Sequence, residues 1–177
     1  MKLHPLACSV ALLAASAVAT TIIPMSVEEM AQKAESIVEA RALDSRSQWN
    51  PQHTLIYTYT RFTVGHTLKG RAAQIITVKQ IGGSAGGYTQ KVSGVRQFQP
   101  GEEALLFLRG SVAGDGTHVV VGLMQGNFRM FRNAAGETMV SNGIADSTRP
   151  RGNIGEVRGT ALALSGMEQR IAKAVSR

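Results

Sequence analysis

Residues 82–86 read GGSAG and match the GxSxG motif of hydrolases, in which a serine nucleophile stands on a sharp turn between a strand and a helix. A strand is expected before this motif, but the composition of residues 87–89 does not allow a helix to start there. Asp115 and His118 are the nearest candidates for the other members of a triad. The chain is also short for an α/β hydrolase. We therefore expect Ser84 to be a chance serine in a glycine-rich loop, and we assign no catalytic residue.

The wider segment 82–94 contains five glycines, a density that favours an exposed, mobile loop without regular structure. Long loops often carry function, and glycines allow backbone amides to approach an anion. No Gly-Lys-Ser or Gly-Lys-Thr follows, so nucleotide binding is not favoured. We take this loop as the candidate binding site, with Gly83, Ser84, Gly86, Gly87, Tyr88 and Gln90 as its residues.

Metal ligands and paired acids show no pattern in the sequence. His53, His66 and His118 lie far apart, and no HExxH pattern brings two of them together. Glu102 and Glu103 are adjacent, so on a strand their side chains would face opposite ways. We predict scattered surface histidines, no metal site and no cofactor.

Aromatic and basic residues alternate along one expected strand, at Tyr57, Tyr59, Arg61 and Phe62. Such residues can form a surface on which single-stranded nucleic acid stacks. The whole chain has only three tyrosines, and the net charge of +7 comes from basic residues that are spread along the chain. We therefore expect a solvated basic surface and no nucleic acid partner.

The amino terminus has the features of a secretory signal. Lys2 supplies a positive charge, the apolar stretch 6–19 is too short to span a bilayer, and the small residues 17–19 offer a cleavage site before Thr20. Cys8 is the only cysteine, so cleavage would leave a chain without thiols or disulfides. We predict an exported protein, periplasmic or secreted, with no membrane span.

Strand patterns dominate the middle of the chain. A capping box of Ser26 and Glu29 begins a short helix, and segment 37–43 then fits either a helix or a strand, with the strand favoured. Segment 54–68 is dense in threonine, aromatic and β-branched residues and predicts a strand. Further strands are expected at 75–81, at the doubly buried run 104–108, and at 118–123, 127–132 and 138–140.

The carboxyl-terminal part begins with residues 141–166, which show no sustained periodicity and are expected to form a loop or tail. A second capping box, Ser165 with Glu168, predicts the start of a terminal helix. Its apolar stripe would consist of Met167, Ile171, Ala174 and Val175. This stripe can dock on the rest of the protein or on a partner.

The segments 34–41, 59–70 and 101–108 together resemble exported bacterial proteins and, more remotely, netrin-like and tissue-inhibitor-of-metalloprotease domains. This resemblance implies a five-stranded OB-type barrel with flanking helices over about Val27 to Val140. The inhibitors chelate a protease zinc through an amino-terminal cysteine, which the mature chain would lack, so that mechanism does not carry over.

The sequence therefore predicts a mainly β protein, a small OB-like antiparallel barrel of five to six strands with a short N-terminal and a C-terminal helix. The expected division is a signal at 1–19, a barrel domain at 20–140 and a tail with a helix at 141–177. The leading hypothesis is a non-enzymatic domain that binds a protein or a cell-envelope component. A secreted hydrolase using Ser84 and an inhibitor or accessory domain for a secreted protease are the alternatives.

Overall fold

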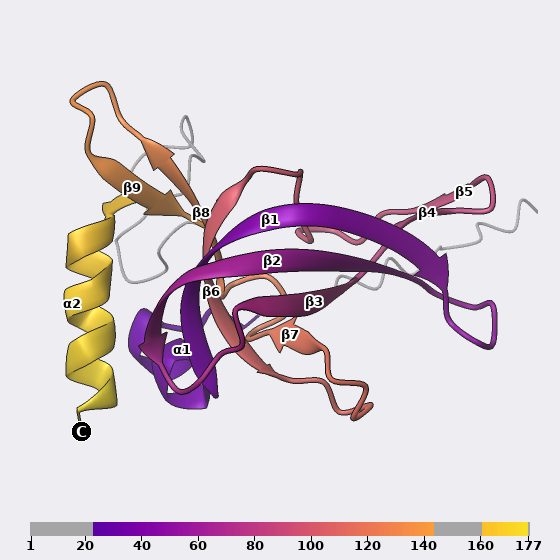
Figure 1. Cartoon of the computed structure of the whole chain (residues 1–177), viewed down its shortest axis with the longest axis horizontal. Helices are drawn as coiled ribbons and strands as arrows, with labels where there is room; N and C mark the ends of the chain where they lie inside the picture. The colour runs from indigo at the N-terminus through magenta and orange to yellow at the C-terminus, as the bar shows by residue number, and fades with distance from the viewer. Residues whose placement is uncertain (1–22, 144–160, 177) are drawn as a thin grey trace, which may run out of the picture.

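The computed structural model describes residues 23–143 and 161–176 and shows a mainly β protein built on a closed five-stranded barrel (Figure 1). The predicted signal at 1–19 and residues 144–160 and 177 of the predicted tail lie outside the described residues. The barrel strands are β1 (Ser36–Trp49), β2 (Ile56–Lys69), β3 (Ile75–Ile81), β6 (Glu103–Gly110) and β7 (His118–Val120). They pair in the order β1-β2-β3-β7-β6, and β6 pairs with β1 to close the ring.

One of the five pairings is parallel, with Val78 of β3 opposite His118 of β7, and the other four are antiparallel. A ring of strands that alternate in direction closes without a parallel pair only when the number of strands is even. Five strands therefore require one parallel pairing. The predicted small barrel with two helices is confirmed, and the arrangement is compatible with an OB-type barrel.

Both long strands, β1 and β2, contain 14 residues and bend around the barrel with three shifts of register between them. Such irregularities let a strand coil strongly enough to close a small barrel. The ambiguous segment 37–43 belongs to β1, as favoured. Its side chains alternate, so that Val38, Ala40 and Ala42 are buried in the barrel while Arg41 and Leu43 are exposed.

The run 104–108 is buried on both faces, as predicted, and it separates two hydrophobic cores. Leu106 and Leu108 point into the barrel, and Leu105 and Phe107 point to the opposite face of β6. That second face is covered by the helices α1 (Val27–Lys33) and α2 (Leu164–Val175). Both helices lie at one end of the molecule, at the left in Figure 1.

The short helix α1 begins at the predicted capping box. Ser26 Oγ accepts from the Glu29 backbone N–H at 3.1 Å, and a Glu29 carboxylate oxygen accepts from the Ser26 N–H at 2.8 Å. At the other end of α1, Lys69 Nζ donates to the carbonyl oxygens of Ala31 and Ala34, at 2.7 and 2.6 Å. A cation at this position stabilises the helix terminus and fixes α1 to the end of β2.

The terminal helix α2 differs from the prediction at its start. Its N-cap is Ala163, which makes no side-chain hydrogen bond, and Ser165 lies inside the helix. The predicted capping box is therefore wrong, and Glu168 is free to point elsewhere. Met167, Ile171 and Ala174 of the predicted stripe are buried against α1 and the barrel, which is the first of the two alternatives, whereas Val175 is 41% exposed.

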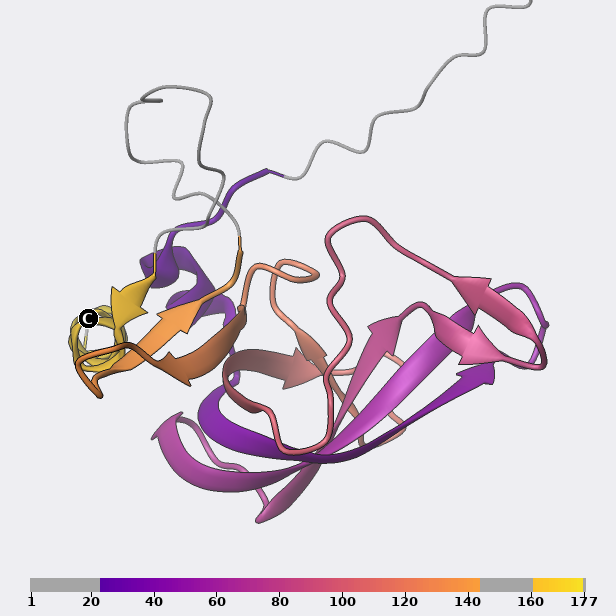
Figure 2. The same cartoon turned by 90° about the horizontal axis from the view of Figure 1, so that it is seen from above.

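The remaining strands extend the sheet beside β6 and build a small hairpin at the far end. They are β8 (Asn127–Arg132), β9 (Thr138–Ser141), β10 (Leu162–Ala163), β4 (Gly83–Ala85) and β5 (Tyr88–Gln90). Seen from above in Figure 2, the β4–β5 hairpin and the two helices occupy opposite ends of the molecule. Among the described residues, no helix is both long and apolar enough to cross a bilayer.

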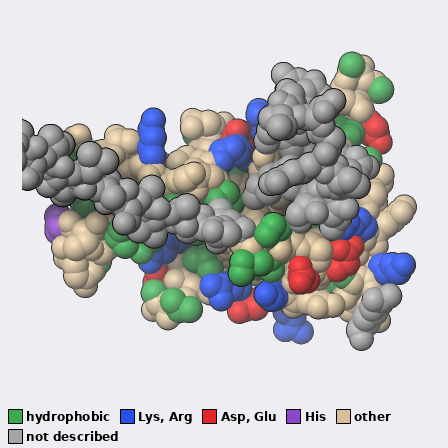
Figure 3. All heavy atoms as spheres, turned by 180° about the vertical axis from the view of Figure 1, so that it is seen from behind, with side chains coloured by type: hydrophobic (Ala, Val, Ile, Leu, Met, Phe, Trp, Pro, Cys, Tyr) green, Lys and Arg blue, Asp and Glu red, His purple; other side chains and the backbone are tan. Residues whose placement is uncertain are grey.

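Charged side chains of both signs are interspersed on the face shown in Figure 3. Exposed ion pairs elsewhere in the described residues include Arg41 with Glu103 and Arg61 with Asp44. This face therefore carries mixed charges, as solvated protein surfaces do, and not a concentration of basic side chains.

Asp115, in the β6–β7 connection, has its carboxylate fixed by Thr117, which donates its hydroxyl at 2.6 Å and its backbone N–H at 3.1 Å to Oδ1. Lys79 Nζ lies 3.4 Å from Oδ2. The Thr117 hydrogen bonds, with a smaller contribution from Lys79, lower the pKa of Asp115 from 3.8 to about 2.

Because this pKa is lower in the folded state, the Asp115 carboxylate stabilises the fold at pH values above its ordinary pKa, and this contribution disappears as the pH falls through about 2. We expect the melting temperature of the parent chain to exceed that of Asp115→Asn at neutral pH. The difference should shrink between about pH 4 and pH 2. Thermal melts of both chains over this range test it, and a difference that stays constant down to pH 2 would contradict it.

Candidate functional site

The predicted glycine-rich loop forms a two-stranded antiparallel hairpin, in which Ser84 of β4 lies opposite Thr89 of β5. The turn consists of Gly86 and Gly87, both with positive φ, at 58° and 80°. Two-residue turns with positive φ at both positions match the twist of hairpin strands, and Gly-Gly is a known signal for them. The expectation of a loop without regular structure is therefore wrong, because the glycines supply the turn.

The hairpin is fixed to the open end of the barrel through the first residues of β2. Ile56 donates its N–H to the Gln90 side-chain oxygen at 2.7 Å, and its carbonyl accepts from the Gly82 N–H at 2.7 Å. The Thr58 hydroxyl donates to the Gly82 carbonyl, also at 2.7 Å. Three hydrogen bonds at one strand end hold the hairpin in a defined position.

Three aromatic side chains gather at this end. Trp49, at the end of β1, stacks with His53 of the β1–β2 turn at a ring separation of 5.9 Å. Tyr88, at the start of β5, meets the Trp49 ring edge-on at 5.7 Å and is 68% exposed. Large amphipathic side chains that are held in place but still accessible are typical of binding surfaces. We call these three residues the aromatic group.

A hollow of about 470 Å³ lies beside the hairpin, which we call the hairpin hollow. Of the predicted site residues, Gly83, Ser84 and Gln90 line it, whereas Gly86, Gly87 and Tyr88 form the turn and its flank. Hydroxyl, amide and apolar groups complete the lining, from Thr89, Lys91, Val92, Ser93, Val95 and Gln97. The hollow therefore presents the mixture of apolar walls and a few polar groups that ligand sites have.

One polar atom at this hollow has no protein partner. Gln97 Nε2 donates to the Ile81 carbonyl at 3.4 Å, but its Oε1 is buried and accepts no hydrogen bond. Buried acceptors without a partner are costly and uncommon in native proteins. A ligand that donates a hydrogen bond would relieve this cost.

Ser84 does not have the surroundings of a nucleophile. It lies on a strand within a hairpin, not on the turn from a strand to a helix that the elbow requires, and its hydroxyl hydrogen-bonds the Thr89 hydroxyl at 2.8 Å. The nearest triad candidates in sequence lie on the β6–β7 hairpin. There Asp115 accepts from Thr117, and His118 begins β7.

The aromatic and basic residues of β2 do not form an open platform. Phe62 is fully buried in the barrel, while Tyr57 and Tyr59 lie on the other face. Lys79 Nζ covers both tyrosine rings, 4.7 Å from the Tyr57 centroid and 5.6 Å from that of Tyr59. Rings engaged in cation–π contacts with Lys79 are less available for base stacking.

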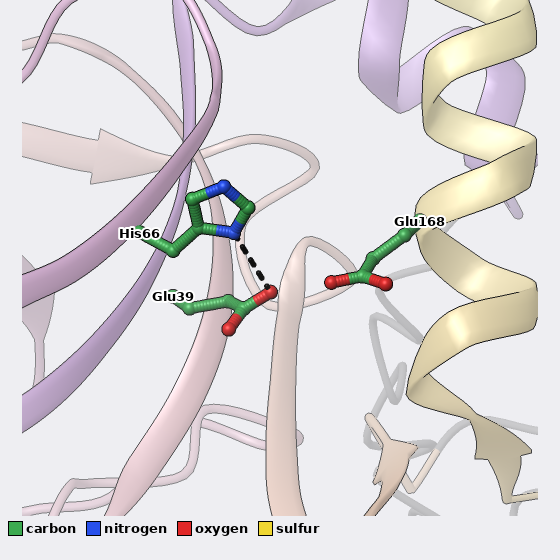
Figure 4. Close-up of side chains that lie close together, drawn as sticks. All are labelled: Glu39, His66 and Glu168. Carbon is green, nitrogen blue, oxygen red and sulfur yellow. Dashed lines mark ion pairs between the residues drawn. The ribbon is translucent and has the colours of Figure 1, made fainter.

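The structure brings together a second group of side chains, potential metal ligands that the sequence did not indicate. Glu39 of β1, His66 of β2 and Glu168 of α2 point toward one another at the helix-covered end of the barrel (Figure 4). One potential ligand atom from each residue lies within 4.8 Å of the other two, and His66 Nδ1 is 3.6 Å from Glu39 Oε1. We call these residues the Glu–His–Glu cluster.

The charged form of Glu39 is disfavoured in the Glu–His–Glu cluster. Burial and the neighbouring Glu168 carboxylate raise the pKa of Glu39, and the His66 imidazole opposes the shift. The sequence could not indicate this cluster, because Glu168 reaches it only when α2 folds back on β1 and β2. The three histidines among the described residues have distinct environments: His53 in the aromatic group, His66 in the cluster and His118 on β7.

No protein-family model and no curated protein matches this chain.

Proposed function

We propose that this protein is an exported, non-enzymatic barrel domain that holds a partner protein at its hairpin end. The observation that carries the proposal is the aromatic group held at the hairpin end of the barrel. Trp49 and Tyr88 are the residue types that most often anchor protein interfaces, and the hollow lined by the same hairpin offers hydrogen-bonding groups for a polypeptide.

The structure of the hairpin favours a polypeptide as the partner, in preference to other components of the cell envelope. β4 and β5 pair only with each other among the described strands, so β5 has a free edge. Thr89 and Gln90 on β5 also line the hollow. An extended segment of a partner can add to such an edge through its backbone while its side chains enter the adjoining hollow.

Crosslinking at the hairpin tests this proposal. A photoreactive phenylalanine analogue placed at position 88 is expected to crosslink a discrete protein of the cell envelope, and the matched control is the same analogue at Phe131 of β8, which is 39% exposed. Trp49→Ala should reduce the crosslink at position 88 at least about tenfold, as expected for a residue that anchors an interface.

Equal crosslinking from positions 88 and 131, or a crosslink unaffected by Trp49→Ala, would contradict the proposal. The hydrolase alternative predicts instead that the purified chain cleaves esters or glycans and that a serine-reactive probe labels it. Labelling that disappears in Ser84→Ala would establish that alternative.

The remote resemblance to netrin-like and metalloprotease-inhibitor domains would make the partner a secreted protease. The OB-compatible barrel with its two helices supports this finer hypothesis. Protease assays with and without the chain test it. The proposed export is tested by cell fractionation, in which the mature chain should be absent from the cytoplasm.

A further inference from the structure

The Glu–His–Glu cluster brings together three elements that are distant in the sequence. Glu39 comes from β1, His66 from β2 and Glu168 from α2, and their side chains converge on one point (Figure 4). Both strands are fixed by their pairing, with Glu39 opposite His66 in the β1–β2 register. Two of the three side chains are therefore positioned by the sheet, and the helix supplies the third.

A basic side chain on each of the two strands is engaged elsewhere. Lys69 donates to the carbonyl oxygens of α1, and Arg41 pairs with Glu103 at 2.6 Å. Within residues 23–143 and 161–176, no ion pair joins a lysine or arginine to Glu39 or Glu168. Two carboxylates thus face each other, and in the described part of the chain the ion pair formed by this group is that of Glu39 with the His66 imidazole.

One ligand atom of the cluster is also buried without a hydrogen-bond partner. Glu39 Oε1 is buried and makes no hydrogen bond, since 3.6 Å to His66 Nδ1 exceeds hydrogen-bond distance. The Glu39 side chain as a whole is 18% exposed. A buried carboxylate oxygen without a donor is unfavourable unless a cation or a proton is nearby.

We propose that Glu39, His66 and Glu168 bind a divalent transition-metal ion. A neutral imidazole nitrogen with two carboxylates is a donor set for Zn²⁺ or Mn²⁺, whereas Ca²⁺ and Mg²⁺ favour oxygen ligands alone. Zn²⁺ binds more tightly than Mn²⁺ to sites of this kind. This site lies at the opposite end of the barrel from the proposed partner surface and does not depend on it.

Binding needs only small movements of side chains. Ligand atoms around a tetrahedral ion with bonds of about 2.1 Å lie about 3.4 Å apart, so atoms now within 4.8 Å must draw together. Exposed His66 and the long Glu168 side chain can do so by rotation. Glu39 also lines a hollow of about 380 Å³ with Arg41, Glu103 and Met130, where water can complete the coordination.

The ion would link α2 to the barrel. It would join the carboxyl-terminal helix to β1 and β2, in addition to the apolar contacts of Met167 and Ile171. A ligand that binds only the folded state stabilises it. At concentrations above the dissociation constant, the free energy of unfolding grows with the logarithm of the ligand concentration, and the melting temperature rises with it. Metal binding and thermal stability should therefore change together.

Titration calorimetry of the chelator-stripped chain, purified without a polyhistidine tag, tests the site. We expect one Zn²⁺ per chain with a dissociation constant of about 10 μM or below, weaker binding of Mn²⁺, and a melting temperature that rises with Zn²⁺. Glu39→Gln, Glu168→Gln and His66→Ala should each weaken Zn²⁺ binding at least about tenfold.

Two control variants separate this site from adventitious binding. Glu103→Gln removes a carboxylate from the same hollow, and His53→Ala removes a histidine from the other end of the barrel, so neither should change Zn²⁺ affinity. Glu39→Gln and Glu168→Gln remove a repulsive charge and should fold without metal, which circular dichroism verifies. Absence of stoichiometric binding at 100-fold the expected dissociation constant, or binding unchanged in all three ligand variants, would overturn the proposal.

Discussion

Replacing Phe98 by alanine is expected to lower the free energy of unfolding by about 3–5 kcal/mol, although this residue lies in a connection without regular structure. Phe98 is 2% exposed and belongs to the barrel core. Its ring meets that of Phe62 edge-on at 4.8 Å, a contact that adds to the loss of buried area. The loop between β5 and β6 thus supplies part of the core that the five strands enclose.

Urea denaturation of the parent, Phe98→Ala and Phe131→Ala chains checks this expectation. Phe131 is 39% exposed on β8, so its removal should cost about 1 kcal/mol or less. The midpoint should fall for Phe98→Ala while the slope with denaturant stays the same. Similar losses for the two variants would show that Phe98 does not complete the core.

Gly83→Ala is expected to cost about 2–5 kcal/mol, combining backbone strain with the loss of a buried hydrogen bond. Gly83 has a φ of 131°, and a Cβ there would overlap both Ser47 Oγ and Thr58 Oγ1. Thr58 donates its one hydroxyl proton to the Gly82 carbonyl, so Ser47 must donate to Thr58 across their 2.8 Å contact. An added methyl group would break this chain of hydrogen bonds.

Gly87→Ala is the matched control, since Gly87 has a φ of 80° in the same hairpin but nothing lies within 4 Å of the position that its added methyl group would take. It should cost only the strain of a left-handed conformation, about 1–2 kcal/mol. The difference between the two variants, measured by chemical denaturation, isolates the contact with Ser47 and Thr58. If both variants lose the same stability, Gly83 is required for its conformation alone.

Most strands could be predicted because their signals are local. The alternation in 54–68 and the apolar run 104–108 directly reflect which side chains the barrel buries. The parallel β3–β7 pairing is not local, but it follows from the number of strands once the ring is known to close. The glycine composition of 82–94 indicates only a loop, whereas the hairpin at 83–90 depends on the position of Gly86-Gly87 as a two-residue turn.

The candidate sites also contain residues that local sequence can indicate and residues that only the fold brings together. Gly83, Ser84 and Gln90 lie within one segment of eight residues, so the sequence alone can place them at one candidate site. Trp49 adjoins Tyr88 only through the hairpin, and Glu168 meets Glu39 only through the docking of α2. The capping-box pattern also gave Glu168 a local role, whereas the helix in fact begins directly after Ala163 and leaves that side chain beyond reach of the cap.

The parallel contact between β3 and β7 has a consequence for how the cylinder can come apart. Its register pairs a single residue of each strand, Val78 with His118, while the neighbouring strands are joined by longer ladders. The β3–β7 pairing is therefore the shortest strand pairing of the barrel. Separation there would unroll the cylinder into one curved sheet with β3 and β7 as its margins, and every antiparallel ladder would remain intact.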